Sequence, residues 1–255
     1  VVFPRHFFDY LKMKPQPFYQ ETQPTWKMGI RFLWGPRKEF FYTFSYELEK
    51  RLPELTRNNG FYFDPETPWL GRASAYMFHG KVFPRQPDGM PRFHNNHAFH
   101  IENKMLVAWL EHRCRELGVH IKDATVQAEK GGAGIAALVT SEGERIVADL
   151  YMDASGFRSE LLGRTLGEPY RSYGDALFCD RAVIGGWERT SEPILPYTTA
   201  ETMDAGWCWQ IEHEHFINRG YVYSSAYASD EEALQEFLKK NPKVTTTPRV
   251  VKFQS

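Results

Sequence analysis

Lys27 is the first residue whose position suggests chemistry. It lies in TWKMGIRFLW, residues 25–34, where apolar and polar residues alternate well enough to predict a β-strand. The apolar face of this strand would carry Trp26, Met28, Ile30 and Phe32. Lys27 would lie on the other face with Gly29 and Arg31, and an inward lysine is costly unless it is paired or has a function. A solvated lysine at the edge of a sheet explains the same pattern without any chemistry.

Two tryptophans, Trp207 and Trp209, are separated by one residue in DAGWCWQIEHEH, residues 204–215. Residues i and i+2 of a strand share a face, so the two indoles would lie side by side, with Ile211 next in the row. Such a pair could line a site that holds or excludes a molecule. It could equally be the apolar face of an ordinary core strand.

The segment ADLYMDASGFRSELL, residues 148–162, predicts a strand–turn–helix junction. An apolar strand would end at Asp153, the chain would turn at Gly156, and a short helix would cover residues 159–167. Small residues such as Ser155 let the phosphates or ribitol of a ligand approach the backbone, and the N-terminus of a helix favours anions. A junction with no ligand is an equally good interpretation of this segment alone.

Histidines occur in two groups that could suggest a metal. On a strand, His213 and His215 would share a face, but no third ligand follows at a suitable spacing, so we expect no metal site. His97 and His100 lie about one helical turn apart, with His94 just before them. We predict that these histidines lie at the entry of a helix, where they are solvated or hydrogen-bonded.

The composition excludes several classes of partner. The chain has 255 residues, 31 basic and 32 acidic, a net charge of −1 and no long run of either sign, so neither nucleic acid nor an anionic membrane is expected to bind. No apolar run is long enough to span a bilayer and no leader peptide opens the sequence. Three widely spaced cysteines argue against a disulfide framework and favour the cytoplasm.

Several elements can be predicted around these candidates. A helix is expected over residues 101–118, with Leu106, Leu110 and Cys114 recurring every four residues. A β-meander is expected over residues 119–155, with a hairpin turn at GGAG because no helix follows those glycines. Further along, residues 219–227 predict a strand. Strands and helices without an internal repeat predict an α/β or α+β chain.

The remaining predictions concern the ends of the chain and one long loop region. A short amphipathic helix is expected over residues 3–13, and a helix capped by Ser229, with Glu232 at the capping-box position, near the other end. Residues 58–96, rich in Pro, Gly, Asn and aromatics, predict a functional loop region or a subdomain. The sequence starts without Met and stops within a predicted strand, so we expect a piece of a longer protein.

Taken together, these segments resemble the flavin-dependent halogenases of the tryptophan-halogenase type. GWCWQI is similar to the WxWxIP signature of that family, TWKMGIRFLW to its lysine-bearing strand, and ADLYMDASGFRS to a flavin-contacting segment. HAFHIENKMLVAWL, GEPY, LPYTTAETMDAGW and RGYVYSS follow in the family's order, so that the resemblance covers nearly the whole chain. It implies a flavoprotein monooxygenase-like α/β fold of two or three layers with a substrate subdomain.

The resemblance also implies a mechanism. In the family, reduced FAD reacts with oxygen, halide (chloride or bromide) attacks the flavin hydroperoxide, and the resulting hypohalous acid travels through a tunnel to a lysine beside the substrate. Lys27 would be that lysine, and Trp207, Trp209 and Ile211 would form the flavin-side motif that keeps substrate and oxidant apart. Asp153, Ser155 and Gly156 would contact FAD, and Thr125 and Val126 would lie by its adenine end.

The same resemblance implies the organisation and partners of the protein. Residues 1–255 would belong to one module, with a substrate-side segment over about 1–100, an FAD-binding helix and meander over about 101–170, and the sheet with the WxWxI motif over about 171–255. A separate flavin reductase would supply reduced FAD. The substrate would be a small electron-rich aromatic (tryptophan or another indole, a phenol or a pyrrole), free or carrier-bound, and a homodimer is compatible with the family.

The sequence departs from the family pattern at three points. Glu212 replaces the signature proline, which could alter the local strand, and neither the glycine-rich FAD loop nor the later segment with the catalytic glutamate is present. The residues that grip tryptophan in tryptophan-specific members are not evident near FFYTFSY. A related flavin monooxygenase without halogenation is therefore the alternative enzyme, and a protein that only binds an aromatic ligand is a third interpretation.

Overall fold

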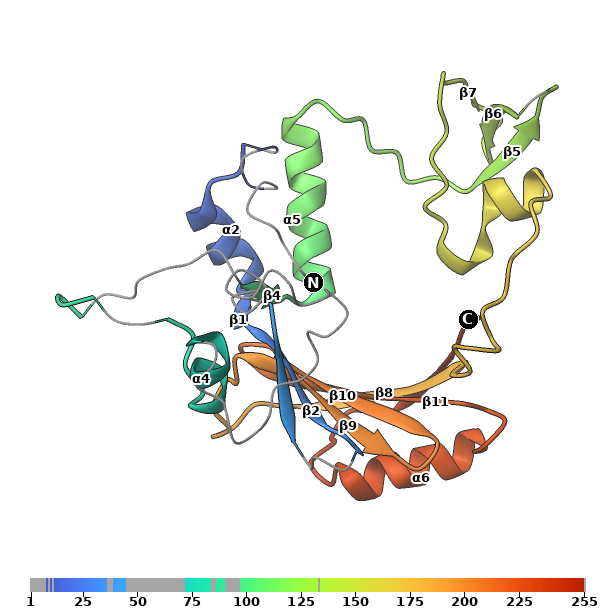
Figure 1. Ribbon diagram of the computed structural model, residues 1–255. Coiled ribbons are helices and arrows are strands. Elements are labelled where there is room, and N and C mark those ends of the chain that lie inside the picture. The colour runs from blue at the N-terminus through green and yellow to red at the C-terminus, as the bar shows by residue number, and fades with distance from the viewer. Residues whose placement is uncertain are drawn as a thin grey trace, which may run out of the picture. The chain divides into compact units, whose positions relative to one another are not determined.

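The computed structural model describes residues 8, 10, 12–35, 39–44, 72–83, 86–89, 97–132 and 134–254. The chain divides into two compact units (Figure 1). The first unit joins Val1–Leu110 with Arg181–Val251, and the second joins Glu111–Asp180 with Lys252–Ser255. Residues 1–100 and most of the segment predicted as 171–255 therefore fall in one unit, whereas residues 171–180 and 252–255 belong to the other. Most of the predicted N-terminal helix and of the loop region at 58–96 lies outside the described residues.

A mixed seven-stranded sheet forms the body of the first unit, in the order β12-β8-β11-β10-β9-β2-β3. Its strands are β2 (Gly29–Leu33), β3 (Phe40–Thr43), β8 (Arg181–Glu188), β9 (Tyr197–Met203), β10 (Gly206–Glu212), β11 (Phe216–Tyr223) and β12 (Arg249–Lys252). The strands from β8 to β9 pair antiparallel through β11 and β10, whereas β2 runs parallel to β9 and antiparallel to β3. The strands predicted around GWCWQI and RGYVYSS are thus confirmed.

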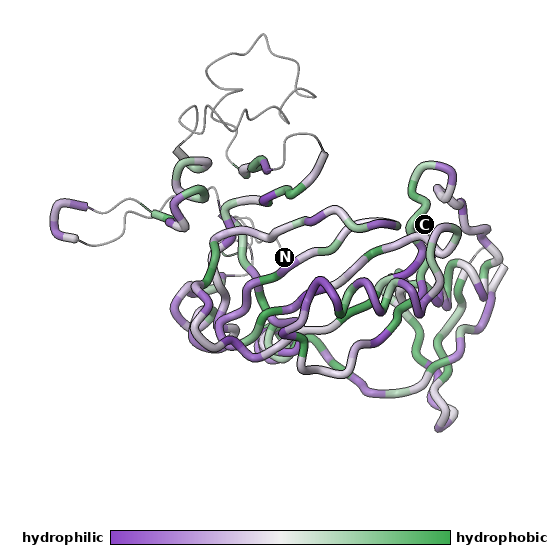
Figure 2. The backbone as a smooth tube through the Cα atoms, turned by 90° about the horizontal axis from the view of Figure 1, so that it is seen from below, coloured by the Kyte–Doolittle hydropathy of each residue, from purple (hydrophilic) through white to green (hydrophobic). Residues whose placement is uncertain are grey.

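Helix α6 (Asp230–Lys240) covers one face of this sheet (Figure 1). Hydrophobic and hydrophilic residues alternate along it at helical spacing, so that one side can be buried (Figure 2). Ala233 and Phe237 are fully buried among Val183, Cys208 and Tyr221 of the sheet. The predicted capping box is confirmed: the hydroxyl of the cap residue accepts the Glu232 amide at 3.2 Å, and the Glu232 carboxylate accepts the amide of the cap residue at 2.9 Å.

A small two-stranded sheet, β1 (Thr25–Lys27) with β4 (Ala98–His100), packs with two helices, of which the second continues past the end of this part of the first unit at Leu110. The helices are α2 (Pro15–Thr22) and α5 (Asn103–Glu116), the second of which confirms the predicted helix. The cluster between these elements contains Met13, Phe18, Phe99, Ile101, Leu106 and Trp109. Cys114 is only half-buried, because this cluster packs against the first part of α5 alone.

The strand predicted over residues 25–34 is divided at Met28, and in this respect the prediction was wrong. β1 pairs with β4 in the small sheet, whereas β2 pairs with β3 and β9 in the large one. Met28 crosses between the sheets: its amide donates to the Pro196 carbonyl at 2.7 Å and its carbonyl accepts from Phe44 at 3.0 Å. Its side chain is buried near α4 (Arg72–Phe78), whereas Trp26 packs against the cluster of α2 and α5.

The second unit contains the predicted meander, with β5 (Val126–Lys130), β6 (Ile135–Thr140) and β7 (Arg145–Ile146) pairing antiparallel in that order. The last strand ends at Ile146 and not at Asp153 as predicted. Leu150 and Met152 are 76% and 85% exposed, because no described strand runs beside residues 147–155 to pair with their backbone. A 3-10 turn (Gly156–Arg158) precedes the predicted helical segment, and a short π-helix (Glu160–Thr165) occupies it. Among the described residues, no helix is long and apolar enough to cross a membrane.

Candidate active site

Lys27 lies at the end of β1, and its face is set by the register with β4. Thr25 is opposite His100 and Lys27 is opposite Ala98 in the antiparallel pair. Opposed residues share a face of a sheet, as do residues i and i+2 of one strand. These four side chains therefore form one face, and Trp26 turns to the other, as predicted.

The surroundings of Lys27 are not those of a solvated edge lysine. Burial lowers the pKa of its ammonium from the ordinary value of 10.5 to about 8. The Nζ atom lies 5.5 Å from the centroid of the Phe44 ring, a distance at which a cation is attracted to the ring face. Among the described residues no carboxylate pairs with Lys27. Near neutral pH the side chain is mostly protonated, but its neutral form is far more accessible than that of an ordinary lysine.

Trp207 and Trp209 lie on the face of the large sheet opposite α6, because Cys208 between them packs under that helix. Their ring centroids are 6.1 Å apart at an interplanar angle of 59°. Trp209 is opposite Gly220 on β11, and its ring lies where a side chain at that position would be: a Cβ on Gly220 would come within 1.9 Å of the indole. The residue opposite Trp209 on β9 is Ala200, so small residues flank this indole on both sides.

The two tryptophans continue into a longer row of rings. Trp34 lies 6.3 Å from Trp207 and 5.5 Å from Phe32, which stacks on Phe40 at 4.9 Å. We call these five residues the aromatic row: Phe40, Phe32, Trp34, Trp207 and Trp209. Their side chains are half-buried apart from Trp34, which is 41% exposed. Sequence reasoning missed the first three members, because only the parallel pairing of β2 with β9 brings them beside β10.

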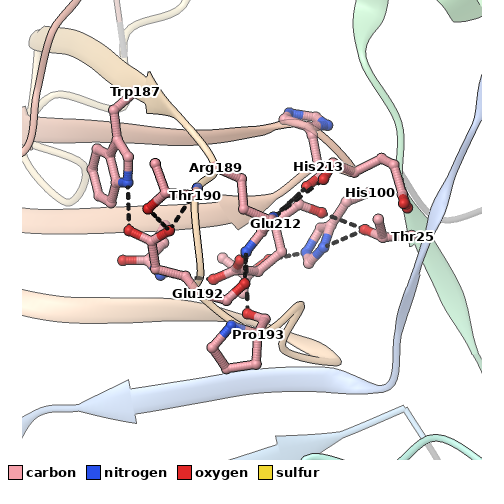
Figure 3. A network of polar contacts seen from close by, with 12 residues as sticks. Thr25, His100, Trp187, Arg189, Thr190, Glu192, Pro193, Glu212 and His213 are labelled. Carbon is pink, nitrogen blue, oxygen red and sulfur yellow. Dashed lines mark hydrogen bonds and ion pairs between the residues drawn. The ribbon is translucent and has the colours of Figure 1, made fainter.

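Glu212 does not disturb its strand. It remains in register with Ile217 of β11, so the replacement of the motif proline does not alter the strand there. Its carboxylate accepts a hydrogen bond from Arg189 at 2.7 Å and another from Gln210 at 2.7 Å (Figure 3). The side chains of Glu212 and Arg189 are only 2% and 8% exposed, so this ion pair is buried. The sequence alone indicated this buried ion pair only by a charged residue, Glu212, at the position where the family motif has proline.

The histidines occupy other places than predicted. His100 belongs to β4 rather than to a helix entry, because α5 begins only at Asn103. Burial and the nearby charge of Lys27 hold the pKa of His100 well below its ordinary value, and its Nε2 lies 2.9 Å from the Thr198 hydroxyl. His97 packs its ring on Trp26 at 4.6 Å.

His213 and His215 do not share a strand face, which was the prediction for the EHEH run. β10 ends at Glu212, and the chain turns there, with the His213 amide donating to the Phe216 carbonyl at 2.9 Å. His94 lies outside the described residues. No three His, Cys, Asp or Glu side chains among the described residues are grouped so that they could hold a metal ion.

Asp153 and Ser155, predicted to contact FAD, stabilise the junction to the short helix. Asp153 accepts the amides of Leu161 and Leu162, both at 2.9 Å, and the hydroxyl of Ser155 at 2.6 Å. The hydrogen bond from Ser155, followed by those from the amides, lowers the pKa of Asp153 to about 2. The amides at the N-terminus of this short helix therefore already have side-chain acceptors within the chain.

The remaining predicted FAD residues leave room for a ligand. Gly156 has a φ of +66°, and nothing lies within 4 Å of a Cβ placed on it, so the backbone can be approached closely there. Val126 begins β5 and is 42% exposed, and the Thr125 carbonyl accepts the Ser141 amide at 3.0 Å. These residues fit a ligand-binding surface on the second unit, whereas their contacts with FAD remain a prediction.

Comparison with known proteins identifies the family. Residues 3–255 match the family model described as tryptophan halogenase. The chain is 29% identical to the tryptophan 6-halogenase SttH of Streptomyces toxytricini over an alignment of 278 residues. This alignment covers 92% of this chain and 51% of SttH. It is 30% identical over 276 residues to the 7-chloro-L-tryptophan 6-halogenase KtzR of Kutzneria sp. (strain 744), and this alignment covers 92% of this chain and 52% of KtzR. The chain thus spans about half the length of the curated relatives it matches.

Solved structures agree with this result. MibH, a lathipeptide tryptophan 5-halogenase, has a TM-score of 0.82 and 36% identity, with 98% of this chain and 48% of MibH covered. BrvH, a flavin-dependent halogenase from Brevundimonas sp. BAL3, has a TM-score of 0.80 and 26% identity, with coverages of 99% and 55%. The predicted mixed α/β fold and the predicted resemblance are both confirmed. The match extends over nearly every residue, and the chain belongs to the tryptophan halogenase family.

Proposed function

We propose that the protein is a flavin-dependent halogenase that places chlorine or bromine on an electron-rich aromatic ring. The first candidate substrate is the indole of tryptophan, because SttH and MibH are named as tryptophan halogenases and KtzR as a halogenase of 7-chloro-L-tryptophan. The MibH name adds tryptophan in a peptide to free tryptophan as a form to be tested. The observation that carries the proposal is Lys27, a half-buried lysine without a described carboxylate partner, with a pKa near 8.

The chemistry assigned to Lys27 is the transfer of halogen from hypohalous acid. As a neutral amine it attacks the halogen atom, water leaves, and an N–halogen bond forms. The aromatic carbon then takes the halogen as a cation equivalent, the ring loses a proton, and the amine is regenerated. As an ammonium group, Lys27 would instead donate a hydrogen bond to the hypohalous acid and polarise it. The lowered pKa makes both forms available near neutral pH.

Reduced FAD and oxygen would supply the oxidising equivalent that converts halide into hypohalous acid. Gly156, Ser155 and Asp153 would contact FAD, and Thr125 and Val126 would lie by its adenine end. A separate flavin reductase would deliver reduced FAD, as the family resemblance implies. The side chains of the aromatic row provide an apolar surface, and Trp207 and Trp209, with Ile211 beside them, would keep the organic substrate away from the oxidant.

The test uses the intact protein with FAD, a flavin reductase, oxygen and either bromide or chloride. Tryptophan, a tryptophan-containing peptide and a simple phenol are offered, and mass spectrometry detects halogenated products. Lys27→Ala is expected to lose the halogenated product but to keep consuming oxygen and releasing peroxide. Lys104→Ala, on the exposed face of α5, is the matched control and should retain wild-type turnover. Full halogenation by Lys27→Ala, or a hydroxylated product formed without halide, would contradict the proposal.

A further inference from the structure

The buried ion pair of Arg189 and Glu212 lies where several segments of the first unit meet (Figure 3). Arg189 directly follows β8, and Glu212 is the last residue of β10. Each carboxylate oxygen of Glu212 has a donor, one from Arg189 and one from Gln210, both at 2.7 Å. A buried ion pair is tolerated when its geometry is good and its remaining hydrogen-bonding groups are satisfied, and here both conditions are met.

Arg189 also binds the backbone of two loops. Its guanidinium donates to the carbonyl of His213 at 2.8 Å, in the turn after β10, and to those of Glu192 at 3.2 Å and Pro193 at 3.1 Å, in the segment before β9. Arginine is suited to this role because its planar group presents five donors in a fixed geometry. The end of β10 and the approach to β9 are thereby held together.

The small sheet that carries Lys27 is attached to this same point. The hydroxyl of Thr25 donates to the backbone carbonyl of Glu212, and Nδ1 of His100 lies 3.5 Å from that hydroxyl. On its other side, Nε2 of His100 lies 2.9 Å from the hydroxyl of Thr198 on β9. Thr25, His100 and Thr198 are all buried, so water does not compete for these hydrogen bonds.

Lys27 is two residues beyond Thr25 on the same strand and the same face. No described hydrogen bond or ion pair holds its ammonium, so its position follows from that of the β1 backbone. That backbone is fixed on one side by Thr25 and on the other by Met28, whose amide donates to Pro196 in the segment that Arg189 also binds. Lys27 and His100 lie diagonally across the β1–β4 pair on the same face, and the charge of Lys27 contributes to the low pKa of His100.

We propose that Thr25 and His100, anchored on the backbone carbonyl of Glu212 and the hydroxyl of Thr198, are positioning residues that fix the place of Lys27. This inference rests on the proposed function, in which Lys27 receives the halogen. Neither Arg189 nor Glu212 contacts Lys27 or the substrate in this scheme. Glu212 supplies the carbonyl that anchors β1, and the ion pair keeps that carbonyl in place.

The test removes one hydroxyl at a time from the intact protein. Thr25→Val keeps the branched shape of the side chain but loses the hydroxyl that donates to Glu212. Thr25→Ser keeps this hydroxyl and should behave like the wild type. Thr22→Val is the matched control, because Thr22 is also fully buried and its hydroxyl donates only within its own helix, to Phe18 at 2.8 Å. Thr198→Val removes the partner of His100 and provides a second, independent variant should Thr25→Val fail to fold.

Two measurements separate positioning from simple structural support. Carbon-13 labelling of lysine Cε gives the titration of Lys27, identified by the signal that Lys27→Arg lacks. In Thr25→Val and Thr198→Val we expect the pKa of Lys27 to rise from about 8 by roughly 0.5 or more, because the loosened strand admits water. We also expect the halogenation kcat to fall on the order of fivefold with KM for the aromatic substrate unchanged. Thr25→Ser and Thr22→Val should match the wild type in both measurements.

An unchanged Lys27 titration in Thr25→Val and Thr198→Val would overturn the inference. So would an equal change in Thr22→Val, because the effect would then follow from any lost buried hydroxyl. A wild-type protein that never halogenates would contradict the proposed function alone, since the titration of Lys27 still reports whether the network positions it.

Discussion

Replacing Gly220 by alanine tests how closely the sheet fits Trp209. Gly220 lies in the middle of β11, directly opposite this tryptophan. A Cβ added there would be 1.9 Å, 2.2 Å and 2.4 Å from three carbon atoms of the indole. Carbon atoms in contact are normally about 3.5–4.0 Å apart, so the ring would have to move by about 1.5–2 Å. The backbone on both sides is fixed by antiparallel pairing with β10 and β8, so the indole must give way.

The expected cost can be estimated from two opposing effects. Overfilling a packed site usually costs about 1–3 kcal/mol, and displacing a large flat ring by this distance belongs in the upper part of that range. Alanine in place of glycine offsets about 0.5–1 kcal/mol of this cost, because alanine loses less backbone conformational entropy than glycine when the chain folds. We therefore expect Gly220→Ala to lower the free energy of unfolding by about 1–2 kcal/mol.

Urea unfolding followed by circular dichroism measures this change. Gly132→Ala is the control, because nothing lies within 4 Å of a Cβ at that turn glycine, and its stability should match or slightly exceed that of the wild type. Combining Gly220→Ala with Trp209→Leu should recover part of the loss relative to the sum of the single changes, since the smaller side chain leaves room for the methyl group. A Gly220→Ala protein as stable as the control, or strict additivity in the double variant, would refute this account of the site.

The remaining predictions concern Lys27, Ser229 and Trp207. Lys27→Met should raise the free energy of unfolding, measured in urea, by about 1–3 kcal/mol and should abolish halogenation. Burial disfavours the charged lysine in the folded state, as its lowered pKa indicates, and methionine removes this cost. If the neutral amine of Lys27 is the acceptor of halogen, kcat should rise with pH and level off above pH about 8; a fall over this range would favour the ammonium. Ser229→Ala should cost about 1 kcal/mol in thermal unfolding by removing the cap of α6, and an unchanged midpoint would count against the capping box. Trp207→Ala should cost less than the 3–5 kcal/mol of a fully buried ring, about 1–3 kcal/mol, because Trp207 is half-buried, and should increase peroxide release per oxygen consumed.

The sequence was most informative where a local pattern decides the structure. The alternation around Trp207 and Trp209 and the capping signal at Ser229 depend on neighbouring residues, and both predictions are confirmed. The strand of Lys27 illustrates the limit. Its alternation continues through Met28, but the chain changes sheets there because β1 pairs with β4 and β2 with β9, and both partners are distant in the sequence.

Two parts of the candidate site could not be predicted for the same reason. The apolar residues before Asp153 predicted a strand, but a strand also requires a neighbour, and no described strand is there. Glu212 was visible only as a departure from the family motif, because its partner Arg189 lies 23 positions earlier in the chain and meets it only through the β8–β11–β10 pairing. Gly220 did carry a signal, since a glycine inside a strand often marks a close approach, here that of Trp209.

The aromatic row also gives the protein an intrinsic optical signal. Trp34, Trp207 and Trp209 have ring centroids 6.3 Å and 6.1 Å apart with interplanar angles of 34° and 59°, so their electronic transitions couple. Coupled indoles at such angles give paired circular dichroism bands of opposite sign. The contribution of Trp34 depends on β2 being aligned with β9, a contact between segments that are far apart in the sequence. The appearance of that band during refolding would therefore time the joining of those two segments without any added label.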